Sequence, residues 1–162
     1  MNNYKFRGKA LASIEKLNEI GVNHDNGWVY GTYIDGYIIN DVLEATDEYI
    51  TIGQWCKVDP ETVGLYTGEK DENNKKIYEN DIIKAYNGIN HIIGIIKFGE
   101  YEPGFYIERI KTIPSEWEIE EGLLFENDSE ITTSIQSYVN IEKIGNTHDN
   151  PELLIGVDIN EN

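Results

Sequence analysis

Short runs of β-branched and aromatic residues, separated by turn signals, recur along this chain and constrain its fold more than any other feature. The run Trp28–Ile34 is followed by Asp35-Gly36 and then by Tyr37–Ile39. An Asp-Gly pair between two such runs tolerates the positive φ angles of a tight hairpin turn. The pattern therefore predicts a mostly β protein in which neighbouring strands are antiparallel.

The same pattern predicts further strands on both sides of this hairpin. A half-exposed strand is also expected around Trp117, where apolar and acidic residues alternate, and 127–136 fits either a loop or a short helix. Asn150 can cap a helical turn that begins with Pro151. The remaining predicted strands are Tyr4–Lys9, Tyr49–Ile52, Asp81–Tyr86, Ile92–Phe98, Gly104–Ile110 and Tyr138–Ile144.

One segment near the N-terminus has helical spacing instead. Leu11, Ile14, Leu17 and Ile20 recur three residues apart before Gly21. This spacing predicts a short amphipathic helix that packs on a sheet and ends at the glycine.

A chain of 162 residues is long enough for one ordinary domain or for two small units, each with a modest core. We expect a helix-plus-β-meander subdomain over residues 1–60, a second β unit over 61–156 that forms a small barrel or sandwich, and a tail over 157–162. The segment Glu61–Ile83 reads as strand, loop and strand, with Asn74 and Asn80 suited to left-handed backbone positions.

The net charge of −17 comes from thirty acidic and thirteen basic residues. Such a charge repels phosphate backbones and anionic lipid headgroups, so it opposes direct nucleic-acid binding and membrane association. Cys56 is the single cysteine, which excludes an intramolecular disulfide and fits a reducing cytoplasm. We expect a cytoplasmic protein, because neither a signal peptide nor a membrane-spanning segment is visible.

Five segments together resemble the YopX-like proteins of phages and prophages. The resemblance covers both ends and the centre of the chain, in roughly the order of that family. The segments are Lys5–Lys9, Gly27–Gly31, Glu61–Ile83, Ile144–Asn146 and Asn150–Leu154.

This resemblance implies an SH3-like barrel from about residue 65 to residue 154 and an origin in a phage or an integrated prophage. The chain departs from the family at Asn74 and Asn80, where glycine is frequent, and in a longer helix near the N-terminus. Asparagine is the next best residue for a positive φ, so the fold is not in doubt. The resemblance implies no defined biochemical activity, and a small barrel by itself does not supply one.

Catalytic and metal-binding patterns are weak in this sequence. His24, His91 and His148 lack the i, i+4 spacing of a metal-binding helix. The pairs His24-Asp25 and His148-Asp149 would suit a metal hydrolase with two histidines and two aspartates, but both lie in turn-like polar contexts. We therefore predict turn or surface roles for the histidines.

Other reactive residues also have structural explanations. Cys56 lacks an assignable base and is expected to be a small buried hydrophobe. Gly64 and Gly68 lack the Gly-Lys-Ser/Thr ending of a phosphate-binding loop, and Asp71 and Asp81 lack a six-oxygen cation pattern around them. We predict that the protein is not an enzyme and has no cofactor or metal.

Aromatic residues are the strongest candidates for an interaction surface. Stacking of single-stranded nucleic acid on them would need a basic groove, which the composition lacks. Tyrosine and tryptophan instead favour core packing and interface anchoring, because they combine large apolar area with a polar tip. The candidates are Trp28, Tyr30, Tyr66 and Tyr78.

An acidic stretch supports an alternative. Ten acidic and two basic residues lie between positions 100 and 130. On a strand, Glu116, Glu118 and Glu120 would project from one face about 6.7 Å apart, similar to the advance of phosphates two steps apart along one DNA strand. Such a face could mimic DNA, although a solvated strand explains the same residues.

We therefore expect a non-enzymatic protein-interaction module whose partner is an unknown protein or a second copy of the chain. The alternative function is an acidic DNA mimic that inhibits a host DNA-binding or defence enzyme.

Overall fold

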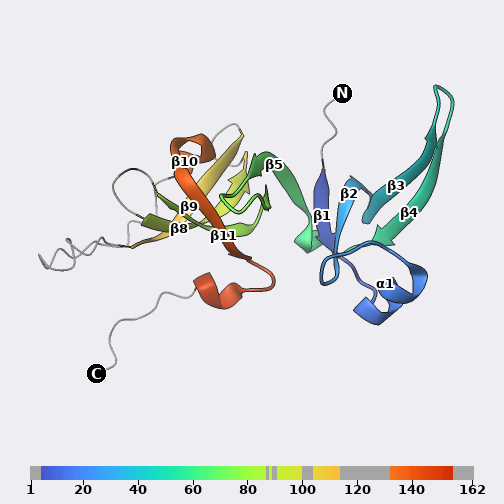
Figure 1. The fold of residues 1–162 in the computed structure, drawn as a ribbon, viewed down its shortest axis with the longest axis horizontal. Coiled ribbons are helices and arrows are strands. Elements are labelled where there is room, and N and C mark those ends of the chain that lie inside the picture. Colours follow the sequence, from blue (N-terminus) through green and yellow to red (C-terminus); the bar gives the residue numbers. More distant parts are fainter. Residues whose placement is uncertain (1–4, 87, 89–90, 100–103, 114–131, 155–162) are drawn as a thin grey trace, which may run out of the picture. The chain divides into compact units, whose positions relative to one another are not determined.

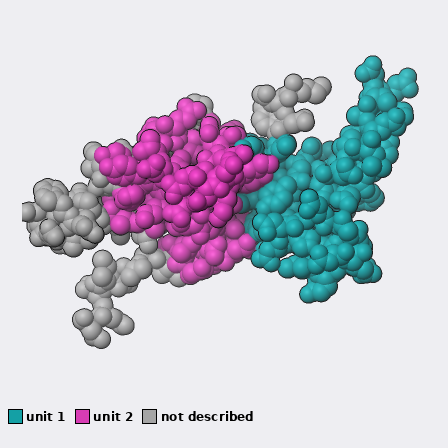
Figure 2. Space-filling view, viewed as in Figure 1, with its two compact units in different colours: residues 1–66 teal, residues 67–162 magenta. Residues whose placement is uncertain are grey.

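The computed structural model describes residues 5–86, 88, 91–99, 104–113 and 132–154 (Figure 1). The chain divides into two compact units, Met1–Tyr66 and Thr67–Asn162 (Figure 2). The predicted boundary after residue 60 lies six residues before the end of unit 1 at Tyr66.

Unit 1 contains an antiparallel sheet with the strand order β4-β3-β2-β1, and the first residues of β5 pair with β1. The β2–β3 turn is the predicted Asp35-Gly36 hairpin, with φ angles of 45° and 84°. Both angles are positive, as a tight two-residue hairpin requires. The elements are β1 (Phe6–Lys9), α1 (Ile14–Ile20), β2 (Trp28–Ile34), β3 (Tyr37–Ala45), β4 (Ile50–Lys57), η1 (Pro60–Thr62) and β5 (Gly64–Lys70).

Helix α1 is shorter than predicted. The Ser13 side chain accepts a hydrogen bond from the backbone N–H of Lys16 at its N-terminus, and Gly21 ends it in a left-handed conformation. Of the expected apolar face, only Leu17 is buried, whereas Leu11 is 60% exposed. The reason is that two turns of helix bring only one apolar position over the sheet, and Leu11 precedes the cap.

The core of unit 1 lies between α1 and one face of the sheet. Its buried members are Leu17, Val22, Val29, Ile38, Cys56 and Val58. The opposite face of β2, β3 and β4 therefore lacks this cover.

Unit 2 contains an antiparallel sheet of five strands in the order β10-β9-β8-β7-β11. The expected closed SH3-like barrel is thus not seen among the described residues, because β10 and β11 end an open sheet. Two register shifts interrupt the β11–β7 pairing. The elements are β6 (Lys76–Tyr78), β7 (Asp81–Tyr86), β8 (His91–Phe98), β9 (Phe105–Ile113), β10 (Thr132–Ser134), η2 (Ile135–Ser137), β11 (Val139–Asn146) and η3 (Pro151–Leu154).

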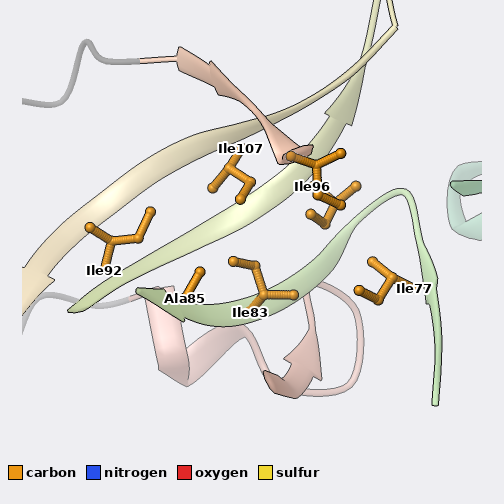
Figure 3. Packing of buried hydrophobic residues seen from close by; sticks show 7 residues of the cluster. Ile77, Ile83, Ala85, Ile92, Ile96 and Ile107 are labelled. Carbon is orange, nitrogen blue, oxygen red and sulfur yellow. The ribbon is translucent and has the colours of Figure 1, made fainter. Parts of the chain in front are cut away.

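Isoleucines from several strands fill the core of unit 2 (Figure 3). β-Branched side chains suit this position, because they pack well on a pleated surface. The buried members are Ile77, Ile83, Ala85, Ile92, Ile96, Ile107 and Ile135.

The prediction of a mostly β protein is confirmed, and so are the left-handed positions of Asn74 and Asn80, whose φ angles are 65° and 64°. The predicted strand around Trp117 lies outside the described residues. Asn150 precedes η3, but its side-chain oxygen accepts a hydrogen bond from the backbone N–H of Asn146. None of the helices in the described part of the chain has the length and hydrophobicity needed to cross a bilayer.

Candidate interaction surface

The four aromatic residues predicted as interaction anchors lie at different depths. Trp28 and Tyr78 are buried, with 6% and 2% of their surface exposed, Tyr66 is half-buried, and Tyr30 is 36% exposed. The guanidinium carbon of Arg7 lies 4.7 Å from the centre of the Trp28 ring, so a cation covers this ring. Trp28 and Tyr78 are thus packing residues and offer little surface to a partner.

The acidic residues of the alternative hypothesis are Glu116, Glu118 and Glu120. All three lie outside the described residues. The proposed acidic face therefore stays a prediction from sequence alone.

An exposed apolar surface that the sequence pattern did not indicate lies on the outer face of β2, β3 and β4. Across neighbouring strands Ile34 is opposite Tyr37, and Ile39 is opposite Trp55. Directly opposite side chains share one face of a sheet, so these pairs are adjacent. We call this surface the apolar strip; it consists of Ile34, Tyr37, Ile39, Val42, Ile50, Ile52 and Trp55.

The exposure of these side chains is high for large apolar residues. Trp55 is 58% exposed, Ile50 56% and Ile34 53%. Single exposed apolar residues are normal on a protein surface, but a contiguous set usually marks a binding surface.

A β-bulge brings the β4 members of the strip onto one face. Residues three apart on a regular strand point to opposite faces, yet Ile52 and Trp55 line the same hollow. The register shifts by one residue between the pairs Asp41–Gln54 and Val42–Ile52, which inserts Gly53 as an extra residue. Bulges commonly re-aim a side chain in this way.

Gly53 is suited to the bulge because little space surrounds its α-carbon. A β-carbon at this position would lie 2.3 Å from Oδ2 of Asp41 and 3.0 Å from Cγ of Leu43. A larger residue would have to displace both side chains, so glycine lets β3 and β4 approach closely here.

The centre of the strip forms a shallow hollow of about 440 Å³. The volume falls within the range of ordinary ligand pockets, but the lining is apolar with one carboxylate, that of Asp35. The hollow is lined by Ile34, Asp35, Tyr37, Ile39, Ile52 and Trp55.

Around the strip the charge is mostly negative, and its distribution is uneven. The segment Ile34–Lys57 carries five carboxylates and one ammonium group, that of Lys57. Strand β4 itself has no acidic side chain. The carboxylates belong to Asp35, Asp41, Glu44, Asp47 and Glu48.

The far end of the β3–β4 hairpin extends away from the core of unit 1 (Figures 1 and 2). Leu43 there is 70% exposed and Tyr49 53% exposed. The turn itself is ordered, because the Thr46 hydroxyl accepts hydrogen bonds from the backbone N–H groups of Glu48 and Tyr49. The Tyr49 hydroxyl donates to the Glu44 carboxylate at 2.9 Å.

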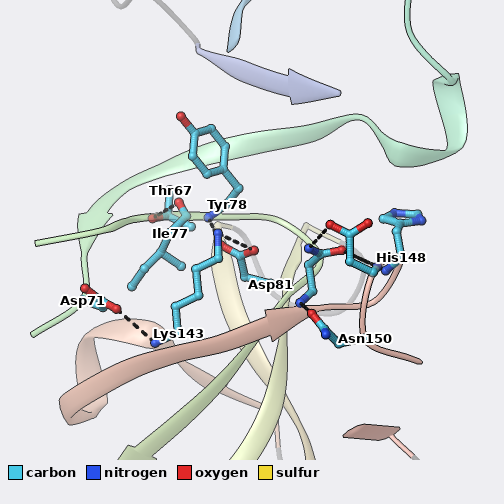
Figure 4. A network of polar contacts seen from close by, with 10 residues as sticks. Thr67, Asp71, Ile77, Tyr78, Asp81, Lys143, His148 and Asn150 are labelled. Atoms are coloured by element: carbon cyan, nitrogen blue, oxygen red, sulfur yellow. Dashed lines mark hydrogen bonds and ion pairs between the residues drawn. The ribbon is translucent and has the colours of Figure 1, made fainter. Parts of the chain in front are cut away.

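Unit 2 contains a network of buried polar groups (Figure 4). The Asp71 carboxylate accepts hydrogen bonds from the backbone N–H groups of Asn73, Lys75 and Lys143. The fully buried Asp81 carboxylate accepts one from the N–H of Tyr78. Each carboxylate holds a turn in place, so a structural role accounts for both.

The ammonium group of Lys143 lies 3.0 Å from Oδ1 of Asp81. At this distance the two opposite charges attract strongly and form an ion pair.

A second hollow of about 560 Å³ lies in unit 2 between the end of β5 and the η2–β11 segment. It is more polar than the first. Of its carboxylates, that of Asp71 is already engaged with three backbone N–H groups. The lining residues are Glu69, Lys70, Asp71, Glu72, Ile135, Gln136, Tyr138, Asn140 and Ile141.

The structure gives local roles to two of the candidate reactive residues. Cys56 is 7% exposed in the core of unit 1, and burial raises the pKa of its thiol. The ring of His24 accepts a hydrogen bond from the backbone N–H of Gly27 and lies 3.2 Å from the Asn18 amide oxygen. Within the described ranges, no three His, Cys, Asp or Glu side chains are grouped so as to hold a metal ion.

Comparisons with known proteins place the chain in a family. A search of curated proteins found no match. Among solved structures, the chain is similar to the crystal structure of protein EF1440 from Enterococcus faecalis, with 21% identity and a TM-score of 0.48, over 94% of this chain and 98% of that one. The model of the family described as YopX protein matches residues 22–155, most of the chain, so the protein belongs to the YopX family.

Proposed function

We propose that this protein is a non-enzymatic protein-interaction module that acts in the bacterial cytoplasm during the life of a phage or prophage. The observation that supports the interaction role is the apolar strip. The phage setting and the cytoplasmic location rest on the resemblance and on the sequence.

The energetics favour a protein partner on this surface. Full burial of one large apolar side chain contributes about 1.5–3 kcal/mol, and six members of the strip are each between 36% and 58% exposed. Covering them together would gain on the order of 5 kcal/mol, which offsets part of the entropy lost on association. A small polar ligand would leave most of this area in water.

A matched pair of variants tests the proposal in a pull-down from bacterial lysate. Ile52→Lys combined with Trp55→Lys places two charges in the hollow. Leu11→Lys combined with Ile20→Lys makes the same charge change at positions that are 60% and 54% exposed outside the strip. Circular dichroism first establishes that both variants fold.

We expect the wild type and the control variant to retain a specific partner, and the strip variant to lose it. Retention should persist at high salt, because apolar contacts are not screened by ions. A partner that binds the strip variant as well as the wild type would refute the proposal. A salt-sensitive, DNA-binding partner that ignores the strip would instead favour the DNA-mimic hypothesis.

A further inference from the structure

The far end of the β3–β4 hairpin is exposed on both of its faces. All twelve residues from Asp41 to Ile52 are exposed, whereas an antiparallel sheet usually buries one face against a core. Five of them are large apolar residues, with exposed fractions from 36% to 70%. We call Asp41–Ile52 the arm; its large apolar residues are Val42, Leu43, Tyr49, Ile50 and Ile52.

The arm is a regular hairpin in spite of this exposure. Strand pairing continues to the turn, where Glu44 is opposite Thr51 and Ala45 is opposite Ile50. A two-stranded ribbon without a covered face has little apolar burial to stabilise it. Because the strand pairing and the turn already fix the backbone, a partner that covers the arm would order few additional residues, which favours binding.

The arm carries negative charge only. Four of its twelve residues are acidic, and it contains no lysine, arginine or histidine. The Glu44 carboxylate accepts a hydrogen bond from the Tyr49 hydroxyl at 2.9 Å, so it is held beside an exposed aromatic residue. Carboxylates and large apolar side chains are therefore presented together. The acidic residues are Asp41, Glu44, Asp47 and Glu48.

The other end of the apolar strip has a different charge. The ammonium group of Lys57 lies 5.9 Å from the centre of the Tyr37 ring. The Asp35 carboxylate lines the same hollow as Tyr37. This end of the strip thus has both a cation and an anion, whereas the arm has anions alone. A partner that lies along the strip should place its own cations at the arm.

We propose, building on the interaction role above, that the arm binds a segment of another protein that combines apolar side chains with lysine or arginine. The apolar side chains of that segment cover those of the arm, and its cations pair with the carboxylates. Exposed ion pairs add little affinity, so binding persists at high salt. A nucleic acid, an anionic membrane or a second copy with a net charge of −17 would bring further negative charge to the arm, which opposes their binding.

Fluorescence anisotropy with the full chain and three synthetic peptides tests this chemistry. The first peptide has leucine and lysine at helical spacing, the second has glutamate in place of lysine, and the third has serine in place of leucine. A helix of about 14 residues is roughly 21 Å long, comparable with the ~17 Å of five strand residues. We expect the leucine–lysine peptide to bind at least about tenfold more tightly than either of the others. Equally tight binding of the glutamate or the serine peptide would overturn the inference.

Two variants with the same change of net charge then test the carboxylates of the arm. Glu44→Gln combined with Glu48→Gln should weaken binding of the leucine–lysine peptide about fivefold, as expected for two exposed ion pairs. Glu69→Gln combined with Glu72→Gln changes two exposed glutamates that line the second hollow. This control should weaken binding less than about twofold, because ions screen distant charges. An equal or larger effect of the control would contradict binding at the arm.

The apolar contribution has a matched control as well. Leu43→Ser combined with Ile50→Ser removes side chains that are 70% and 56% exposed in the arm. Leu11→Ser combined with Ile20→Ser removes side chains that are 60% and 54% exposed outside it. Once circular dichroism shows that both variants fold, we expect a loss of affinity of at least about tenfold for the arm variant and less than about twofold for the control. Equal losses would refute the assigned site.

This inference and the proposed function fail differently. If the partner in the pull-down depends on Ile52 and Trp55 but peptide binding is insensitive to the arm variants, the interaction role stands and the inference about the arm is wrong. If the strip variant leaves every pull-down partner unchanged, the interaction role itself is wrong.

Discussion

Replacing Asp71 by alanine should destabilise unit 2 strongly. One carboxylate oxygen accepts hydrogen bonds from the N–H groups of Asn73 and Lys75 at 2.9 and 2.8 Å, and the other accepts from Lys143 at 3.2 Å. A hydrogen bond to a charged group contributes about 1.5–3 kcal/mol. The donors of Asn73 and Lys75 lie in an exposed turn and regain water in the variant, so the expected loss is about 3 kcal/mol rather than the sum of three bonds.

Urea denaturation followed by circular dichroism measures this loss, and Asp47→Ala is the matched control. Asp47 is exposed in the β3–β4 turn, so its replacement removes the same charge without removing a described hydrogen bond. The loss of stability in Asp71→Asn should lie between those of Asp71→Ala and Asp47→Ala, at about 1–2 kcal/mol. Its amide oxygen still accepts a hydrogen bond, but its NH₂ group faces a backbone donor. Hydrogen exchange should accelerate at Asn73, Lys75 and Lys143. If Asp71→Ala cost less than about 1 kcal/mol, or no more than the control, the assigned role of this carboxylate would be refuted.

Three further perturbations test the packing. Gly31→Ala should destabilise unit 1 by more than about 2 kcal/mol in thermal denaturation. The new β-carbon would lie 1.9 Å from the carbonyl oxygen of Ile39, a backbone atom that cannot move aside. A neutral result would contradict the β2–β3 geometry. Lys143→Met should cost about 3–5 kcal/mol, because it removes the ammonium group that lies 3.0 Å from the fully buried Asp81 carboxylate, and adding Asp81→Asn should recover part of that loss in the same assay. Burial raises the pKa of the Cys56 thiol, so the thiol ionises at a lower pH in the unfolded chain than in the folded one. The free energy of unfolding should therefore fall as the pH rises through the ordinary thiol range. Urea titrations of Cys56→Ala should lack this fall.

Much of the fold could be predicted from local sequence signals. The Asp35-Gly36 pair indicated a two-residue hairpin because both residues accept positive φ, and Asn74 and Asn80 indicated left-handed positions for the same reason. The predicted helix was too long, because the three-residue spacing that begins at Leu11 does not reveal that Ser13 caps helix α1. The open sheet of unit 2 was not predictable, because strand periodicity does not determine whether the first and last strands meet.

The apolar strip was the least predictable feature. Burial depends on which groups pack over a side chain in the folded protein, so an aromatic residue such as Trp28 or Tyr78 looks the same in sequence whether it is exposed or buried. The strip also depends on the bulge at Gly53, because strict alternation would place Ile52 and Trp55 on opposite faces. The glycine between them was the available signal, since an isolated glycine inside a strand often marks a bulge.

Photo-cross-linking in bacteria that express the full chain tests the interaction role of the apolar strip most directly. A benzophenone amino acid is placed at position 55 within the strip, or at position 11 as an exposed control outside it. We predict that position 55 yields a discrete protein adduct, either with another protein or with a second copy of the chain, and that position 11 does not. Equal labelling at both positions, or none at position 55, would contradict the assignment of this surface.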